Sequence, residues 1–143
     1  MRTVRDADGN RYLLLKESGQ ASLVRDPDTG DTRHLPNDQW ELVDGESPLE
    51  TAASALPEMI RRVMTAVHDE RALGLLLEIE TRGPVDIRTL LSAYDLCESD
   101  LHGLLTEFRA AGLLEEATAN GQRGYATTDE ASAALAVLHR ELD

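Results

Sequence analysis

A fixed order of helix and strand signals in the second half most constrains how this 143-residue sequence can fold. From Asp69 to Thr81 apolar residues recur at helical spacing, which predicts one helix. Asp86 is placed to act as the N-cap of a second, short helix over 87–94. After a tight turn at 95–96, a longer helix ends at Ala111-Gly112, where glycine supplies the left-handed C-terminal residue. The buried face of this longer helix is expected to consist of Leu101, Leu104, Leu105 and Phe108.

Two short strands after this helix are predicted to pair as a β-hairpin. They cover about 113–118 and 123–127, and the Asn120-Gly121 dipeptide between them favours a type I′ turn. Thr128 or Asp129 then caps a final helix. The second half thus predicts the order helix, helix, turn, helix, hairpin, helix, which is the layout of a winged helix-turn-helix domain. The inward positions of the final helix are Ala131, Ala134, Leu135, Leu138 and Leu142.

Three segments resemble the winged helix-turn-helix superfamily in detail. Residues 96–101, Leu-Cys-Glu-Ser-Asp-Leu, resemble its turn and the first turn of its recognition helix, and 111–114, Ala-Gly-Leu-Leu, resemble the start of its wing. Residues 124–130 resemble the end of the wing in MarR- and ArsR-like regulators, Tyr-x-Thr-x-x-Gly, with Glu130 or Ala131 where glycine is common. The chain also resembles small haloarchaeal winged-helix proteins. The similarity covers about half of the chain and implies a DNA-binding transcriptional regulator.

The first 45 residues instead alternate short β-type runs with turn signals, such as Asp8-Gly9-Asn10 and 26–30. This pattern predicts an antiparallel meander of four or five strands. Because a small sheet is marginal alone, we expect its apolar face to pack on the helices that follow. Candidates for that face are Leu13, Leu15, Leu23, Leu35, Trp40 and Leu42.

The domain organisation follows from these segments. Residues 1–46 are predicted to form the antiparallel β meander, 47–68 the linking and dimerisation helices, and 69–143 the winged helix-turn-helix domain. A helix begins near Pro48, and Pro57 interrupts it or opens the next one. The expected fold class is therefore α+β, with an N-terminal antiparallel β meander followed by helices and a C-terminal winged helix-turn-helix domain.

The net charge of the chain affects whether a nucleic acid can be its partner. There are 14 basic residues and 27 acidic ones, a net charge of −13, which ordinarily argues against a polyanionic partner. All but one of the basic residues are arginine, Lys16 is the only lysine, and aromatic residues make up 3%. This composition resembles the bias of haloarchaeal proteins, whose cytoplasm is concentrated in salt. The acidity then reflects the solvent more than the partner, and DNA binding stays open.

The recognition helix and the wing supply the predicted DNA contacts. Ser99 and Thr106 can bond base edges or phosphates, and His102 can donate to guanine or to a phosphate. The arginines beside them are expected at phosphates or in the minor groove. The full predicted set is Arg88, Ser99, His102, Thr106, Arg109, Gln122 and Arg123.

A low basic content keeps a second function open. Between Pro84 and Thr128, three basic residues stand against seven acidic ones, and winged helices also serve as protein–protein interaction modules that do not bind DNA. In both cases a homodimer is expected, since the helices over 48–67 and 129–142 carry many apolar positions and such regulators usually pair through terminal helices. The meander is expected to bind a protein partner, to sense a small ligand, or to extend the DNA-contacting surface with its arginines.

Catalytic and metal-binding patterns do not occur in the sequence. The four histidines are scattered, no Cys/His pair has zinc spacing, and there is no nucleophile or phosphate-loop motif. Neither an enzymatic activity nor a cofactor is expected. Cys97, at the predicted N-cap of the recognition helix, is either a redox-sensitive thiol or a small turn residue. No apolar run reaches the roughly 18–20 residues of a membrane span, so a cytoplasmic protein without a membrane partner is expected.

Overall fold

The computed structural model describes residues 1–140 and has the expected α+β class, with antiparallel strands first and a winged helix-turn-helix after them. The chain divides into two compact units, one over Met1–Pro57 and one from Glu58 onward. This division falls inside 47–68, so the first helix of that segment belongs with the meander and the second with the C-terminal unit. No helix within 1–140 is both long and apolar enough to cross a membrane.

The N-terminal unit is a five-stranded antiparallel sheet followed by one short helix. Its elements are β1 (Arg2–Asp6), β2 (Arg11–Lys16), β3 (Ala21–Arg25), β4 (Thr32–Pro36), the 3-10 turn η1 (Asn37–Gln39), β5 (Trp40–Leu42) and α1 (Pro48–Ala53). The strand order is β4-β3-β2-β1-β5. The 3-10 turn precedes the last strand, and that strand returns to pair with β1 at the edge of the sheet.

The apolar interior of the sheet differs from the predicted face at four positions, one of which is Leu13, buried on the other face of the sheet. Leu15 and Leu23 are only partly buried, and Leu42 is 42% exposed. The pairing register explains the difference on β2 and β3, because Leu14 pairs with Val24, so alternation puts Leu13 and Leu23 on the other face; Leu42 lies on the edge strand β5. The observed cluster consists of Val4, Tyr12, Leu14, Val24 and Leu35, with Trp40 packed against them.

The helix α1 packs on the opposite face of the sheet from this cluster. Thr3 and Leu13 are paired in register and both are buried, and Thr3 Oγ1 lies 2.6 Å from Thr51 Oγ1 of α1. The expectation that the apolar face packs on the following helices is therefore wrong for the main cluster, because the strands carry buried residues on both faces.

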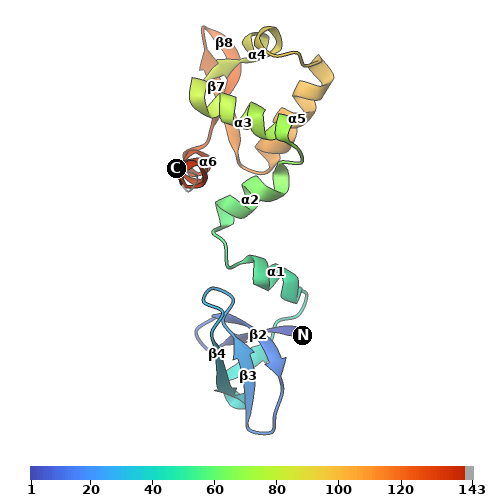
Figure 1. The fold of residues 1–143 in the computed structure, drawn as a ribbon, viewed down its shortest axis with the longest axis vertical. Helices are drawn as coiled ribbons and strands as arrows, with labels where there is room; N and C mark the ends of the chain where they lie inside the picture. Colours follow the sequence, from blue (N-terminus) through green and yellow to red (C-terminus); the bar gives the residue numbers. More distant parts are fainter. Residues whose placement is uncertain (141–143) are drawn as a thin grey trace. The chain divides into compact units, whose positions relative to one another are not determined.

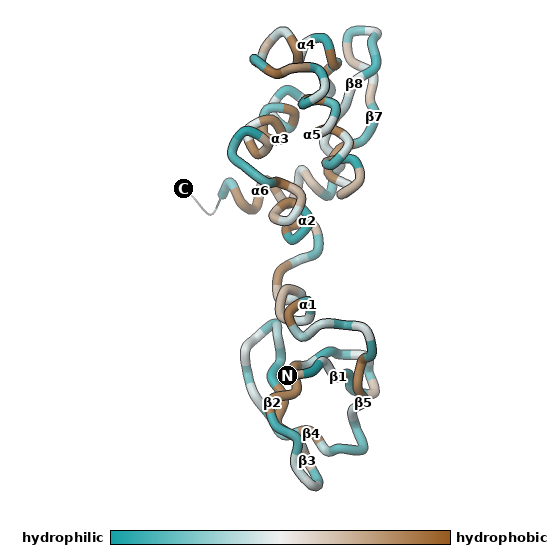
Figure 2. Tube along the Cα trace, turned by 90° about the vertical axis from the view of Figure 1, so that its right-hand side faces the viewer, coloured by the Kyte–Doolittle hydropathy of each residue, from teal (hydrophilic) through white to brown (hydrophobic). Residues whose placement is uncertain are grey.

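The C-terminal unit has the predicted order of helices and hairpin, with one further strand. Its elements are α2 (Glu58–Ala66), α3 (Glu70–Arg82), β6 (Val85–Asp86), α4 (Ile87–Ala93), α5 (Glu98–Ala110), β7 (Leu114–Ala119), β8 (Gln122–Thr127) and α6 (Asp129–Arg140). Within this unit α3 and α5 lie side by side, and β7 and β8 form the hairpin that follows α5 (Figure 1). Hydrophobic and hydrophilic residues are interspersed along α2 and α3 (Figure 2), as expected for helices with one apolar and one polar face.

Side chains cap three of these helices, and two of the caps, Asp86 and Thr128, are among the residues that the sequence analysis proposed. Asp69 and Thr128 each accept a hydrogen bond from the backbone amide three residues on, at 2.8 Å and 3.2 Å, at the starts of α3 and α6. Asp86 accepts both the amide hydrogen bond (3.2 Å) and the hydroxyl hydrogen bond (2.6 Å) of Thr89 at the start of α4. The amides so bonded have no carbonyl partner inside their helices, which is why these residue types are favoured there.

Buried side chains anchor α5 and α6 in the core of this unit. Leu101, Leu105 and Phe108 are at most 1% exposed, as predicted for α5, and burial of each is worth about 1.5–3 kcal/mol. In α6, Leu138 is 37% exposed, and Leu142 lies outside the described residues. The inward positions confirmed in α6 are Ala131, Ala134 and Leu135.

The hairpin closes through the predicted turn. Asn120 has φ 54° and Gly121 has φ 73°, and a type I′ turn needs positive φ at both positions. The pair Ala119 and Gln122 closes the two-residue loop, so the strands start and end within one residue of the predicted bounds.

The strand β6 is a feature that the sequence pattern did not predict. It pairs with β8 through Val85–Tyr125 and Asp86–Gly124, which gives a three-stranded sheet of order β6-β8-β7. The approach is so close that a Cβ on Gly124 would lie 2.1 Å from the carbonyl oxygen of Val85. Only glycine fits at this position, and through it the start of α4 is fixed to the wing.

Candidate nucleic-acid interface

Four exposed side chains lie along one face of α5. Ser99, His102, Thr106 and Arg109 follow one another at intervals of three, four and three residues, and all four are exposed. This spacing keeps them on one side of the helix, opposite the buried face. At 1.5 Å per residue the set extends over about 15 Å. We call these four residues the polar stripe of α5.

Local contacts orient the members of the polar stripe. His102 Nε2 lies 3.6 Å from Glu98 Oε1, and Thr106 donates its hydroxyl hydrogen to the carbonyl oxygen of His102 at 2.8 Å. Ser99 Oγ lies 3.4 Å from the sulfur of Cys97, the N-cap residue of α5. Because its hydrogen is used within the helix, Thr106 presents its lone pairs outward as an acceptor, whereas His102 and Ser99 can reorient to donate.

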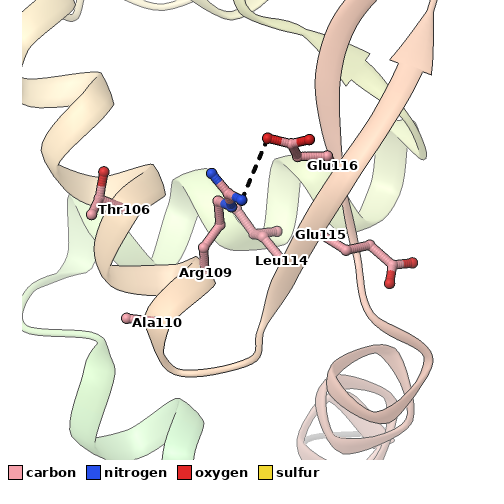
Figure 3. Close-up of a pocket in the computed structure, with 6 residues that line it drawn as sticks. All are labelled: Thr106, Arg109, Ala110, Leu114, Glu115 and Glu116. Atoms are coloured by element: carbon pink, nitrogen blue, oxygen red, sulfur yellow. Dashed lines mark ion pairs between the residues drawn. The ribbon is translucent and has the colours of Figure 1, made fainter.

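Arg109, at the end of the polar stripe, contacts the wing. Arg109 Nη2 lies 3.4 Å from Glu116 Oε1 on β7, and its guanidinium lies 5.6 Å from the ring centroid of Tyr125 on β8. Arg123 on β8 binds the same Oε1 atom of Glu116 through its own Nη2. Figure 3 shows Arg109 and Glu116 pointing toward one another from α5 and β7. We call Arg109, Glu116, Arg123 and Tyr125 the Glu116 cluster.

The other two predicted contacts stand apart from this cluster. Arg88 is exposed on α4, and within residues 1–140 it has no ion-pair partner. Gln122 is exposed at the first position of β8, next to Arg123 in the chain, so its side chain points to the other face of the hairpin. The structure therefore brings Arg109 and Arg123 together and aligns three further residues with Arg109, but it leaves Arg88 and Gln122 separate.

The sequence prediction did not assign a role to Glu116 or Tyr125. One signal for Glu116 was available, because a two-residue turn at 120–121 sets Thr118 opposite Arg123 and Glu116 opposite Tyr125. Glu116 is then the diagonal neighbour of Arg123 on one face of the hairpin. The contact with Arg109 depends on how α5 packs on β7, which no local pattern specifies.

Two electrostatic effects accompany this arrangement. The Thr89 hydroxyl, by donating to Asp86, holds the pKa of that carboxyl below its ordinary value, although burial acts in the opposite direction. The hydrogen bond and charge of Glu116 raise the pKa of Arg123. Asp86 therefore remains ionised as the cap of α4, and Arg123 remains cationic beside Glu116.

Cys97 and the histidines give no constellation typical of a catalytic or metal site. Cys97 is an exposed free thiol that makes no side-chain capping bond. Among residues 1–140, no three or more His, Cys, Asp or Glu side chains are grouped so as to hold a metal ion. The interface described above thus rests on hydrogen-bonding and charged side chains of α5 and the wing.

Comparison with known proteins gives two solved structures and one family. An ArsR-like transcriptional regulator from Rhodococcus sp. RHA1 is 20% identical, with 58% of this chain and 78% of that chain covered and a TM-score of 0.46. A crystal structure of an ArsR family transcriptional regulator is 18% identical, with 61% and 89% covered and a TM-score of 0.44. No curated protein matches the chain. The model of a family of unknown function, DUF7346, matches residues 1–139, and the chain belongs to that family.

Proposed function

We propose that this protein is a DNA-binding transcriptional regulator that reads the major groove with α5. The observation that carries the proposal is the polar stripe, in which Ser99, His102 and Thr106 are exposed along one face of a helix whose other face is buried. A helix fits the major groove, which is about 12 Å wide, and base edges there present donors and acceptors to hydroxyl and imidazole groups. The buried leucines and Phe108 hold the stripe in a fixed orientation, which base readout requires.

The wing and α4 supply contacts to the DNA backbone in this proposal. Arg123 and Gln122 lie beside the turn of the hairpin, and Arg88 lies near the start of α4. Such contacts set the register of the protein on the duplex without reading sequence. Arg88 has no acidic partner within residues 1–140, so it is available to a phosphate without breaking an ion pair.

The acidic composition fits DNA binding in a concentrated-salt cytoplasm, as in haloarchaea. At such ionic strength the release of counterions contributes little to affinity, so a dense basic surface has little value and shape and base contacts carry more of the binding. A net charge of −13 with one lysine is the composition expected of a chain adapted to that solvent. The thermal midpoint of unfolding should accordingly rise as KCl is increased from 0.1 M to 2 M.

We further propose a homodimer formed through α2 and α6. Met64 on α2 is 59% exposed and Leu138 on α6 is 37% exposed, and these two helices pack on one another within the C-terminal unit. A second copy of the chain would cover these side chains and would place two α5 helices for two half-sites.

A second candidate function is a protein–protein interaction module that does not bind DNA. The observation that favours it is the Glu116 cluster, in which one carboxylate already neutralises part of the charge of Arg109 and Arg123. In this alternative the polar stripe or the meander contacts a protein partner.

Retardation of genomic DNA fragments, measured at KCl concentrations from 0.2 M to 2 M, separates the two candidates. A regulator should retard a subset of fragments, and Thr106→Ala combined with His102→Ala should abolish that selectivity. If no fragment is retarded at any salt concentration and a protein partner is captured stably, the DNA-binding proposal is wrong.

A further inference from the structure

We propose that Arg109 and Arg123 form one phosphate-binding site at the junction of α5 and the wing, and that the carboxylate of Glu116 occupies this site until a phosphate group displaces it. Where the phosphate belongs to DNA, this inference rests on the proposed function. The inference goes beyond the proposed function, because it names the two arginines that act on one phosphate and the residue that competes with that phosphate.

The first argument is convergence. Nη2 of Arg109 and Nη2 of Arg123 both approach a single atom, Oε1 of Glu116, the former at 3.4 Å. Two guanidinium groups from different elements thus point at one oxyanion position. Because a guanidinium has five N–H donors in a planar fork, a phosphate at this place can satisfy both arginines with separate oxygens, which one carboxylate oxygen does not.

The second argument is that the fold places Arg109 and the backbone of Arg123 independently of Glu116. Arg109 is in the last turn of α5 and lies over the ring of Tyr125, which is 6% exposed. Arg123 is fixed opposite Thr118 by the hairpin register. Removal of the Glu116 carboxylate therefore leaves the Arg109 guanidinium over Tyr125, and it leaves Arg123 on the same face of the hairpin, from which its long, exposed side chain can still reach a phosphate beside Arg109.

The third argument is that Glu116 can leave at low cost. Its side chain is 47% exposed, and it borders an open hollow of about 660 Å³ between the end of α5 and β7. Exposed ion pairs are individually weak, so an incoming phosphate can replace them. Within the cluster two positive charges stand against the one negative charge of Glu116, and Glu115 is a second carboxylate that lines the hollow.

The consequence is a specific effect of one acidic residue on DNA affinity. Because Glu116 must be displaced, it lowers the affinity for a phosphate below that of the two arginines alone. Glu116→Gln should tighten DNA binding roughly threefold to tenfold, which corresponds to the loss of two exposed ion pairs. It should also make the slope of log Kd against log[KCl] steeper by about one, because one more counterion is released on binding.

Glu115→Gln is the matched control for this experiment. Glu115 precedes Glu116 on β7 and lines the same hollow, is exposed and carries the same charge, and within 1–140 it has no ion-pair partner. Figure 3 shows its side chain directed away from Arg109. The full-length wild type and both variants are titrated against a fluorescein-labelled random-sequence duplex of 30 base pairs, with anisotropy as the readout. Tighter binding and a steeper slope for Glu116→Gln alone support the proposal, whereas equal changes in both variants, or none, overturn it.

A second arm uses inorganic phosphate and needs no DNA. The side-chain Nε–H signals of Arg109 and Arg123 are followed by NMR during a phosphate titration of the wild type and of Glu116→Gln. Both signals should shift together, with a lower half-saturation concentration in the variant, and independent or absent shifts overturn the shared site. If neither protein binds the duplex at any KCl concentration, the proposed function fails, and the phosphate titration still decides whether the site exists.

Discussion

Replacing Gly124 with alanine tests how the wing holds the helix-turn-helix. The new Cβ would lie 2.1 Å from the carbonyl oxygen of Val85 and 2.7 Å from the Cα of Asp86, where ordinary contacts begin near 3.4 Å. Both atoms belong to backbone, so no side-chain rotation relieves the overlap. The strand β6 must therefore move away from β8 by more than about 1 Å, which ends hydrogen bonding in a pairing of only two residues.

The cost can be worked from the contacts that are lost. Each backbone hydrogen bond of this pairing contributes about 0.5–1.5 kcal/mol, and Val85, which is 4% exposed, loses part of its burial. Together these terms give a loss of about 2–4 kcal/mol. For a unit of this size each kcal/mol lowers the melting temperature by about 4–8 °C, so a decrease of about 10–25 °C is expected.

The assay is thermal unfolding in 2 M KCl followed by circular dichroism at 222 nm, which reports mainly on the helices of the C-terminal unit. Gly103→Ala is the matched control, because Gly103 lies exposed in α5 with open space around its Cα. Alanine there should raise stability by about 0.5–1 kcal/mol, since it only removes the entropic cost of glycine in a helix. A melting temperature for Gly124→Ala within 2 °C of the wild type would refute the account of β6.

Three further predictions concern the core, a helix cap and the proposed dimer. Phe108→Ala removes a fully buried ring and should lower the free energy of unfolding in urea by about 3–5 kcal/mol; a loss below 1 kcal/mol would show that α5 is anchored otherwise. The pKa of Asp86 is lowered in the folded state, so its stabilisation is complete above the unfolded-state value of about 3.9 and disappears as the pH falls through the lower folded-state value. The stability difference between the wild type and Asp86→Asn should therefore shrink below about pH 4, and a constant difference down to pH 2.5 would contradict this role. Met64→Glu should reduce the mass in light scattering from that of a dimer to the 15.7 kDa of one chain, and a wild type already at 15.7 kDa would exclude the dimer.

Much of the C-terminal fold could be predicted because its signals are local. Asp69, Asp86 and Thr128 cap helices through residues three positions away, and Asn120-Gly121 fixes a turn by its own backbone angles. Because such features depend only on residues close in the chain, they can be predicted from the sequence. The strand β6 was not predicted because a strand of two residues shows no periodicity. Its pairing with Gly124 also joins segments that lie almost forty positions apart in the chain.

Local sequence patterns did not predict the interior of the meander or the contacts of the Glu116 cluster. Alternation allows either Leu13 and Leu23 or Leu14 and Val24 to face the main cluster, and the sequence does not show which of the two faces is used because buried residues occur on both. The polar stripe of α5 was predictable, since helical spacing alone puts Ser99, His102 and Thr106 on one side. The pairing of Arg109 with Glu116 was not, because it depends on how α5 packs against β7.

The central claim, that the polar stripe of α5 reads DNA sequence, is tested most directly by selecting bound fragments from sheared genomic DNA of the source organism at 2 M KCl and sequencing them. The wild type should enrich fragments that share a short motif, and a variant with Ser99→Ala, His102→Ala and Thr106→Ala should lose that motif while it stays folded by circular dichroism. If the wild type enriches no motif, or if the variant enriches the same one, α5 is not the element that reads DNA.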